Sequence, residues 1–469
     1  MQQRYASLID IGSTFTKGVL VDLDETKIIS TYRVPTTIST GIQNGFYTIL
    51  KVFQTQLTGQ ENDTIVLVSS SAAGGLKVVV VGLSKTLSLK AATQISFNAG
   101  AKIAGSFYNK LTYEDIDEID SVNADILLLT GGIDGGEETD VQHNARMLIK
   151  LKTNPSIVYA GNKKIAPRIA GILGDSGKQC VLADNVLPEL NQMNMEPAKQ
   201  AIADLFFEKI VFANGLEEVA NIAEKKVIPT PSAVLSASKL LSEGPGNEKG
   251  FGPIVIIDVG GATTDVCSVC HVDTENSESI YRGLPEPYLK RTVEGDIGLR
   301  SSAKTLLERD KEKRGFDSES LEAYVDFVTH SIEYLPKSLE HVDLDKKLAQ
   351  IAIHHSFKRH CGRSQTIRTI EGELTIQQGK NLSAVQSIIA TGGIFCNRSN
   401  VAITILKEAY EAIHDPFMLK PKSPDLLVDH DYIVSAMGLL AGIDEVCAYT
   451  LMRNSILSSP GANIRGHLS

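Results

Sequence analysis

The chain has 469 residues, and its 46 basic and 56 acidic side chains leave a formal net charge of -10. This length exceeds one hydrophobic core, so we expect two or three globular domains. The negative balance gives no overall attraction to phosphate backbones or anionic surfaces, which predicts neither a nucleic-acid nor a membrane partner. No apolar run reaches the ~20 residues of a membrane helix, and a strand already begins at Ser7, before which no signal peptide fits. We therefore expect a soluble, cytoplasmic protein.

The six cysteines are too scattered for a disulfide scaffold. Only Cys267 and Cys270 are close together, and no second ligand pair completes a zinc site, so buried thiols are the expected role. Segment 354–361 also holds three histidines and a cysteine. Its flanking Lys and Arg residues predict a helix with polar surface or cleft positions rather than a metal site.

Strand-like and helix-like segments alternate along most of the chain, which indicates α/β layers with largely parallel sheets. Expected strands lie at 6–12, 17–23, 27–34, 64–70, 76–83, 125–132, 156–161 and 178–184. Segment 41–56 predicts a helix, and 198–226 a helix or helix pair. Gly, Pro and charged residues crowd segment 240–253, which is typical of a linker.

These patterns predict two main domains. The first spans 1–245 and includes an α/β extension or inserted lobe at about 83–245. The second spans 246–469 and ends in closing helices.

The first hairpin has an unusual turn. LIDIGSTFTKGVLVDLD, residues 8–24, places an aspartate, a glycine and three hydroxyl residues between two apolar strands. After the linker, IVIIDVGGATTDVCSVCHVD, residues 254–273, repeats the pattern: an apolar strand, an Asp, a Gly two residues on, small or hydroxyl residues and a second apolar strand. An internal duplication of a strand-turn-strand unit explains both segments.

The residue types in these turns suit phosphate and a cation. Glycine turns bring backbone N–H groups close to a ligand, and hydroxyls add donors. Asp10 and Asp258 would repel bare phosphate, so their carboxylates predict Mg²⁺ between them and the phosphates. Lys17 is placed to balance charge at the outer phosphates. The expected phosphate-binding residues are Gly12, Ser13, Thr14, Lys17, Gly260, Gly261, Thr263 and Thr264.

A third element completes the set. SIIATGGIF, residues 387–395, is an apolar strand that ends in Gly392 and Gly393 and is followed by a helix-forming segment. Paired glycines permit close approach to a base or its ribose. A plain hairpin with a glycine turn would explain one of these units, but not two matching units followed by this third one.

This combination resembles the actin, sugar-kinase and heat-shock-seventy ATPase superfamily, in which two ribonuclease-H-like lobes hold ATP in a cleft. The resemblance implies two phosphate loops, 10–17 and 258–265, and an adenosine motif, 390–393. It implies ATP and Mg²⁺ as ligands, with Asp10 and Asp258 as catalytic residues and metal ligands. One departure is Ala262, where many members carry a third glycine.

Longer blocks resemble a narrower group, the glutamate mutase accessory proteins of the GlmL or MutL type, which are unrelated to the mismatch-repair protein of similar name. The blocks are 68–83, 127–148, 183–202, 291–303 and 420–441. By analogy with diol dehydratase reactivases, the resemblance implies a slow ATPase that releases damaged cobalamin from adenosylcobalamin-dependent glutamate mutase. It leaves open an oligomer or a small second subunit.

Two acidic segments have alternative interpretations. Asp134 and Glu137, in GGIDGGEETD, either face the nucleotide cleft near the metal or, more simply, form a glycine turn before an acidic helix start. In EGDIG, residues 294–298, the acids either contact the nucleotide or cap a helix.

Two other functions share the predicted fold. A small-molecule kinase needs an aspartate base and an acceptor pocket, and an actin-like filament protein needs self-complementary surfaces. A heat-shock-seventy type is disfavoured because too few residues follow Gly393 for a peptide-binding domain.

Overall fold

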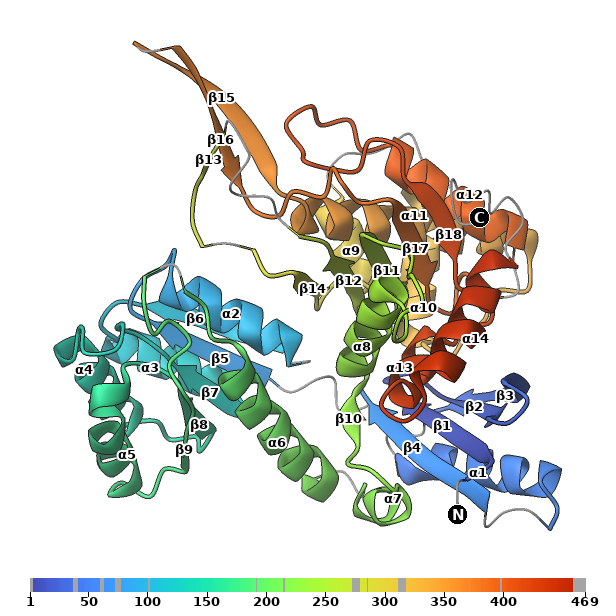
Figure 1. Cartoon of the computed structure of the whole chain (residues 1–469), viewed down its shortest axis with the longest axis horizontal. Coiled ribbons are helices and arrows are strands. Elements are labelled where there is room, and N and C mark those ends of the chain that lie inside the picture. Colours follow the sequence, from blue (N-terminus) through green and yellow to red (C-terminus); the bar gives the residue numbers. More distant parts are fainter. Residues whose placement is uncertain are drawn as a thin grey trace. The chain divides into compact units, whose positions relative to one another are not determined.

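The structure is a computed structural model of the chain (Figure 1). It describes residues 3–36, 41–59, 63–71, 77–99, 102–190, 192–213, 216–271, 279–284, 286–310, 318–370, 372–396 and 399–458. The chain forms two units. Unit 1 comprises Met1–Ala72, Glu218–Arg282 and Glu286–Ser469, and unit 2 comprises Ala73–Glu217 with Gly283–Pro285.

The first sheet of unit 1 has the strand order β10-β4-β1-β2-β3. Strands β1, β2 and β3 form an antiparallel meander, and β4 and β10 continue it in parallel with β1. The strands are β1 (Tyr5–Ile11), β2 (Phe15–Asp22), β3 (Lys27–Pro35), β4 (Thr64–Ser70) and β10 (Ile228–Pro229). Every residue of β1 is buried, as expected for the central strand of a sheet covered on both faces.

The second sheet of unit 1 has the order β14-β12-β11-β17-β18. Here β11, β12 and β14 form an antiparallel meander, and β17 and β18 run parallel to β11. The strands are β11 (Ile254–Val259), β12 (Thr264–Val269), β14 (Leu289–Glu294), β17 (Ser387–Thr391) and β18 (Asp425–Val428). Both sheets therefore share the ribonuclease-H-like order, and the predicted duplication extends beyond the hairpins to whole sheets.

Helices cover the two sheets of unit 1 (Figure 1). They are α1 (Gln43–Gln56), α7 (Glu217–Ile222), α8 (Thr230–Glu243), α9 (Ala303–Arg309), α10 (Ser318–His330), α11 (Leu339–His360), α12 (Ser399–Glu411), α13 (Val434–Leu440) and α14 (Glu445–Leu457). Helices α8, α13 and α14 share one core cluster with both sheets, and this cluster includes Leu8 of β1 and Ile256 of β11. Burial of this common apolar surface joins the two sheets in one unit.

A small third sheet interrupts the second half of unit 1. It consists of β13 (Ser279–Tyr281), β15 (Arg363–Thr369) and β16 (Gly372–Gln378), in the order β13-β16-β15. These strands are not expected from the sequence, because their Thr, Gln and Arg residues leave little apolar alternation.

Unit 2 is a separate parallel α/β layer structure with the strand order β6-β5-β7-β8-β9. This is the 2-1-3-4-5 order of flavodoxin-like folds. Its strands are β5 (Lys77–Gly82), β6 (Lys102–Tyr108), β7 (Ile126–Leu129), β8 (Ser156–Tyr159) and β9 (Cys180–Leu182). Its helices are α2 (Ser88–Asn98), α3 (Tyr113–Val122), α4 (Thr139–Leu148), η2 (Lys163–Ile165), α5 (Ala166–Gly174) and α6 (Glu196–Ala213). The predicted fold class, two ribonuclease-H-like domains with an additional α/β lobe, is confirmed.

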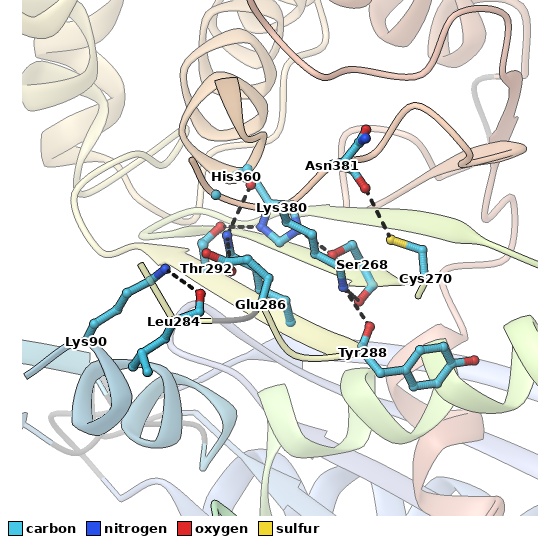
Figure 2. Close-up of polar contacts among 12 residues, drawn as sticks. Lys90, Ser268, Cys270, Leu284, Glu286, Tyr288, Thr292, His360, Lys380 and Asn381 are labelled. Atoms are coloured by element: carbon cyan, nitrogen blue, oxygen red, sulfur yellow. Dashed lines mark hydrogen bonds and ion pairs between the residues drawn. The ribbon is translucent and has the colours of Figure 1, made fainter. Parts of the chain in front are cut away.

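The structure confirms the prediction for Cys267 and Cys270 and contradicts part of the prediction for segment 354–361. Cys267 and Cys270 are buried free thiols, as expected. The prediction of polar surface or cleft positions in 354–361 is wrong for His354, His360 and Cys361, which are buried because this face of α11 packs on the second sheet. Figure 2 shows the resulting network: His360 joins the hydroxyls of Thr292 (2.9 Å) and Ser268 (2.7 Å) through its two ring nitrogens, and the fully buried Lys380 donates to the Tyr288 carbonyl (2.6 Å).

Within the described residues, no three His, Cys, Asp or Glu side chains lie close enough together to hold a metal ion. Among the same residues, none of the helices has both the length and the apolar character needed to span a bilayer.

Candidate nucleotide site between two matched turns

The two predicted phosphate turns have the same backbone geometry. In the first, the Gly12 N–H donates to the Phe15 carbonyl at 3.1 Å, and in the second the Gly260 N–H donates to the Thr263 carbonyl at 2.9 Å. A Cβ built on Gly12 would lie 2.6 Å from the Phe15 oxygen, and one on Gly260 would lie 2.9 Å from the Thr263 oxygen. Glycine is therefore needed at both positions because the turn closes directly over its Cα.

The two turns converge within unit 1. A Cβ built on Gly261 would lie 3.0 Å from Oγ1 of Thr14, so the turns touch. The Lys17 ammonium lies 3.6 Å from Oδ2 of Asp10. Lys17 has its pKa raised: burial acts in the opposite direction, and the attraction of Tyr432, Asp10 and Asp258 outweighs it. The structure thus brings both aspartates and the lysine to one place.

Asp10 lies at the end of β1 and is held by two hydroxyls. Oδ1 accepts hydrogen bonds from Ser69 at 2.9 Å and from Thr230 at 2.5 Å. Ser69 is on the neighbouring strand β4, and Thr230 is the first residue of α8. The carboxylate is therefore fixed from two sides, with Lys17 on its other oxygen. The sequence analysis identified Asp10 but neither of the residues that orient it.

Asp258 occupies the equivalent position on β11 in a different environment. Its Oδ1 is buried and has no hydrogen-bond partner. Burial raises the pKa of Asp258 to about 7; the Lys17 ammonium opposes this rise, and the neighbouring carboxylates of Asp265, Asp10 and Asp429 reinforce it. A buried carboxylate oxygen without a donor is costly unless a cation approaches it. The donor set, two neighbouring carboxylates, fits Mg²⁺, which in proteins usually takes one or two carboxylates, waters and phosphate oxygens.

The hydroxyl residues of the two turns are not equivalent. Ser13, Thr14 and Thr263 are half-buried on the turns themselves. Thr264 is fully buried at the start of β12, and its Oγ1 also has no hydrogen-bond partner. The first three side chains therefore lie on the phosphate turns, while Thr264 is buried at the start of β12.

The predicted adenosine turn lies next to the second phosphate turn, because β17 pairs with β11 and places Thr391 opposite Asp258. Gly392 has φ +127°, and a Cβ there would lie 2.4 Å from the Val259 carbonyl oxygen. Only glycine fits this approach. Gly393 follows it and has no backbone neighbour within 4 Å of a built Cβ; its near neighbour is the Tyr432 ring, at 3.9 Å.

The block 291–303 supports the second phosphate turn from behind. The N–H groups of Leu299 and Arg300 donate to the carbonyls of Gly260 (3.1 Å) and Gly261 (2.7 Å). The capping interpretation of EGDIG is wrong, because α9 begins only at Ala303 with Ser302 before it. The Asp296 carboxylate instead pairs with Arg309.

The acidic loop of unit 2 is held by its own neighbours. Asp134 accepts from the Lys163 N–H and from Asn185, both at 2.8 Å. Glu137 accepts from the Asp140 N–H at 2.8 Å, in the first turn of α4. These contacts are those expected of the simpler interpretation, a glycine turn before an acidic helix start.

Four residues that the sequence analysis did not single out shape the site: Ser69, Thr230, Asp429 and Tyr432. Two signals were present in the sequence. Ser69 lies in block 68–83 and Asp429 and Tyr432 in block 420–441, both of which carried the family resemblance. Thr230 had no signal, because only the fold brings the start of α8 to Asp10. Residues 72–76 of block 68–83 lie outside the described residues.

The strand order of the two sheets and the paired turns between them define an actin-like ATPase fold. The family model described as "MutL protein" matches residues 6–456. Protein MutL of Clostridium tetanomorphum is 38% identical over 440 residues, which cover 92% of this chain and 95% of that protein. The chain therefore belongs to the MutL protein family, as the sequence blocks predicted.

Solved structures with similarity to the chain are more distant. A nucleotide-free acetone carboxylase is 14% identical with a TM-score of 0.41, over 93% of this chain and 70% of that one. A ligand-bound xylulose kinase from Lactobacillus acidophilus is 10% identical with a TM-score of 0.35, over 96% and 92%.

Proposed function

We propose that this protein is a slow ATPase that acts as an accessory protein of adenosylcobalamin-dependent glutamate mutase and uses ATP to release or exchange damaged cobalamin. The observation that carries the proposal is the meeting of Asp10, Asp258 and Lys17 from two matched turns of two matched sheets. Two carboxylates and an ammonium at glycine turns are the groups that a triphosphate and its cation require.

In this proposal the two turns hold the phosphates. Backbone N–H groups and the hydroxyls of Ser13, Thr14 and Thr263 donate to phosphate oxygens, and Lys17 balances the charge of the outer phosphates. The glycines at 392 and 393 leave room for the adenosine beside β17. The buried Thr264 supports the turn from within the sheet.

Asp10 and Asp258 are the proposed ligands of Mg²⁺. When bound, the ion would neutralise charge that develops on the phosphate oxygens during transfer. The chain contributes the fixed orientation of Asp10, through Ser69 and Thr230, and an Asp258 oxygen that no protein group has already engaged.

Hydrolysis requires a water to attack the terminal phosphorus and lose its proton, with ADP and phosphate as products. The attacking water would lie near Asp10 or Asp258, and one of these two carboxylates would accept its proton. Loss of the terminal phosphate removes one of the contacts that hold the two sheets together, and their opening would be the useful output.

The mutase as partner comes from the resemblance of the sequence blocks to glutamate mutase accessory proteins. The same proposal includes the mutase subunits as partners and an oligomer or a small second subunit. It also includes the division of the chain into two main domains at about residue 245. Among the residues that the structure describes, no feature of the site favours a small-molecule kinase or a filament protein.

The test is direct. Purified protein should hydrolyse ATP slowly without any added small substrate, and should restore turnover to glutamate mutase stalled with an inactive cobalamin. Asp10→Ala should lower both activities at least about a hundredfold. Asp22→Ala, at the other end of the same hairpin, is the matched control and should keep both. Rescue without ATP, or stoichiometric phosphorylation of a metabolite, would contradict the proposal.

A further inference from the structure

One side chain links the first phosphate turn to the second sheet. The Lys17 ammonium, on β2, donates a hydrogen bond to the phenol oxygen of Tyr432, which follows β18. The same ammonium lies 4.1 Å from the centroid of the Tyr432 ring, within cation–π distance. Tyr432 thus contacts Lys17 through both its hydroxyl and its ring, over a sequence separation of 415 residues.

The backbone of Tyr432 is held in an unusual conformation. Its φ is +57°, in the left-handed region that bulky residues rarely adopt. Asp429 stabilises the segment, since its carboxylate accepts from the N–H groups of Ile433 (3.2 Å) and Val434 (3.0 Å) at the start of α13. Thr391 and Ser455 donate to the same carboxylate at 2.8 and 3.0 Å. Such strain persists where surrounding contacts impose it and concentrates at functional sites.

The ring lies between the two ends of the proposed nucleotide site. One edge faces Gly393 of the adenosine turn, where a built Cβ would lie 3.9 Å from Cε1, and the hydroxyl faces Lys17 at the phosphate turns. An ammonium has three donors. Tyr432 takes one and Asp10 lies 3.6 Å away, which leaves donor capacity for a phosphate oxygen.

We propose that Tyr432 is a positioning residue that holds the Lys17 ammonium toward the outer phosphates, so that the site distinguishes ATP from ADP. The inference rests on the ATP site proposed above. Without the phenol, the flexible lysine stem samples other rotamers and must be reordered when ATP binds. ADP lacks the terminal phosphate, so its affinity should change little.

The test compares Tyr432→Phe, which keeps the ring and removes the hydroxyl, with Tyr449→Phe as a matched control. Tyr449, on α14, is buried in the same unit, and its hydroxyl donates a hydrogen bond to the Lys249 carbonyl at 3.1 Å. For Tyr432→Phe we expect the Kd of ATP to rise about tenfold, as for loss of one hydrogen bond to a charged group. The Kd of ADP should change less than twofold, and KM should rise with kcat nearly unchanged.

A second readout needs no nucleotide. Labelling of Lys17 by an amine-reactive ester, followed by mass spectrometry, should be several-fold faster in Tyr432→Phe than in wild type or Tyr449→Phe, because the ammonium is less restrained. Equal labelling, or equal losses for ATP and ADP, would overturn the role of Tyr432. If wild type bound no ATP while labelling still depended on Tyr432, the ATP proposal alone would fail.

Discussion

The two hairpins share a backbone and differ in charge. In the first, β1 pairs Asp10 with Lys17 across the hairpin; in the second, the equivalent pair is Asp258 and Asp265. Opposite charges placed across a hairpin attract each other, whereas two carboxylates placed across it repel each other. The duplicated scaffold therefore carries one balanced aspartate and one that needs an external cation.

The second hairpin has its own compensation. Arg291, on β14, donates to Asp265 at 3.0 Å and is itself buried. The guanidinium neutralises Asp265 but not Asp258, whose Oδ1 remains without a donor. The asymmetry between the turns therefore lies seven positions past each aspartate, where Lys17 and Asp265 differ in charge, and not in the glycine turn.

The largest effect should follow from removing that compensation. Arg291→Met leaves the Asp265 carboxylate in the sheet without its partner, which should lower the free energy of unfolding by about 3 kcal/mol, measured by urea denaturation. The double variant Arg291→Met, Asp265→Asn should recover part of the loss. Equal losses in the single and double variants would show that Arg291 acts through packing alone.

The backbone likeness of the turns can be tested with alanine. Gly12→Ala places a Cβ 2.6 Å from a carbonyl oxygen of its own turn, and Gly260→Ala does so at 2.9 Å. Overpacking of this kind costs about 1–3 kcal/mol, so both variants should be less stable and Gly12→Ala the more so. Thermal unfolding of both proteins checks the ranking. The reverse order would mean that the second turn is the more rigid one.

A smaller, pH-dependent effect should distinguish the aspartates. The pKa of Asp258 is raised to about 7 in the folded protein by burial, so its protonated form favours folding. Its contribution to stability is full below pH ~4, the unfolded pKa, and is lost as pH rises to about 7. Asp258→Asn, which cannot ionise, should therefore raise Tm by about 2 °C at pH 8 and leave it unchanged at pH 4.

Magnesium gives the control for this measurement. At pH 8 the ion should stabilise wild type and not Asp258→Asn, because binding to the folded state alone raises the unfolding free energy. Stabilisation of both proteins by the same amount would place the cation elsewhere.

Most of the architecture could be predicted from local patterns. Apolar strands separated by a glycine turn, such as 8–24 and 254–273, can be recognised from the sequence alone, because strands buried on both faces need continuous apolar runs. The strands that escaped prediction are β6, β10, β13, β14, β15, β16 and β18. These strands are short or carry polar residues, so no regular apolar alternation marks them. Two of them, β10 and β13, also pair with strands far away in the chain, which local composition does not encode.

The candidate site divides in the same way. Asp10, Asp258 and the glycines were identified because their chemistry is written in consecutive residues. His354 and His360 of α11 were misplaced because polarity alone predicted exposure, whereas both are buried and His360 has a hydrogen bond on each ring nitrogen. Helix capping was one of the two interpretations of EGDIG because the start of α9 could not be located from sequence to within a turn.

By itself the sequence determined the α/β class, the duplication and the family, since each follows from short patterns or from long blocks of matching residues. Only the tertiary structure decided that Thr230 and Ser69 restrain Asp10, that Oδ1 of Asp258 is left without a donor, and that Tyr432 reaches Lys17. The physical reason is that a side chain's hydrogen bonds and charge partners depend on what the packed core brings beside it. Those partners lie tens to hundreds of residues away along the chain.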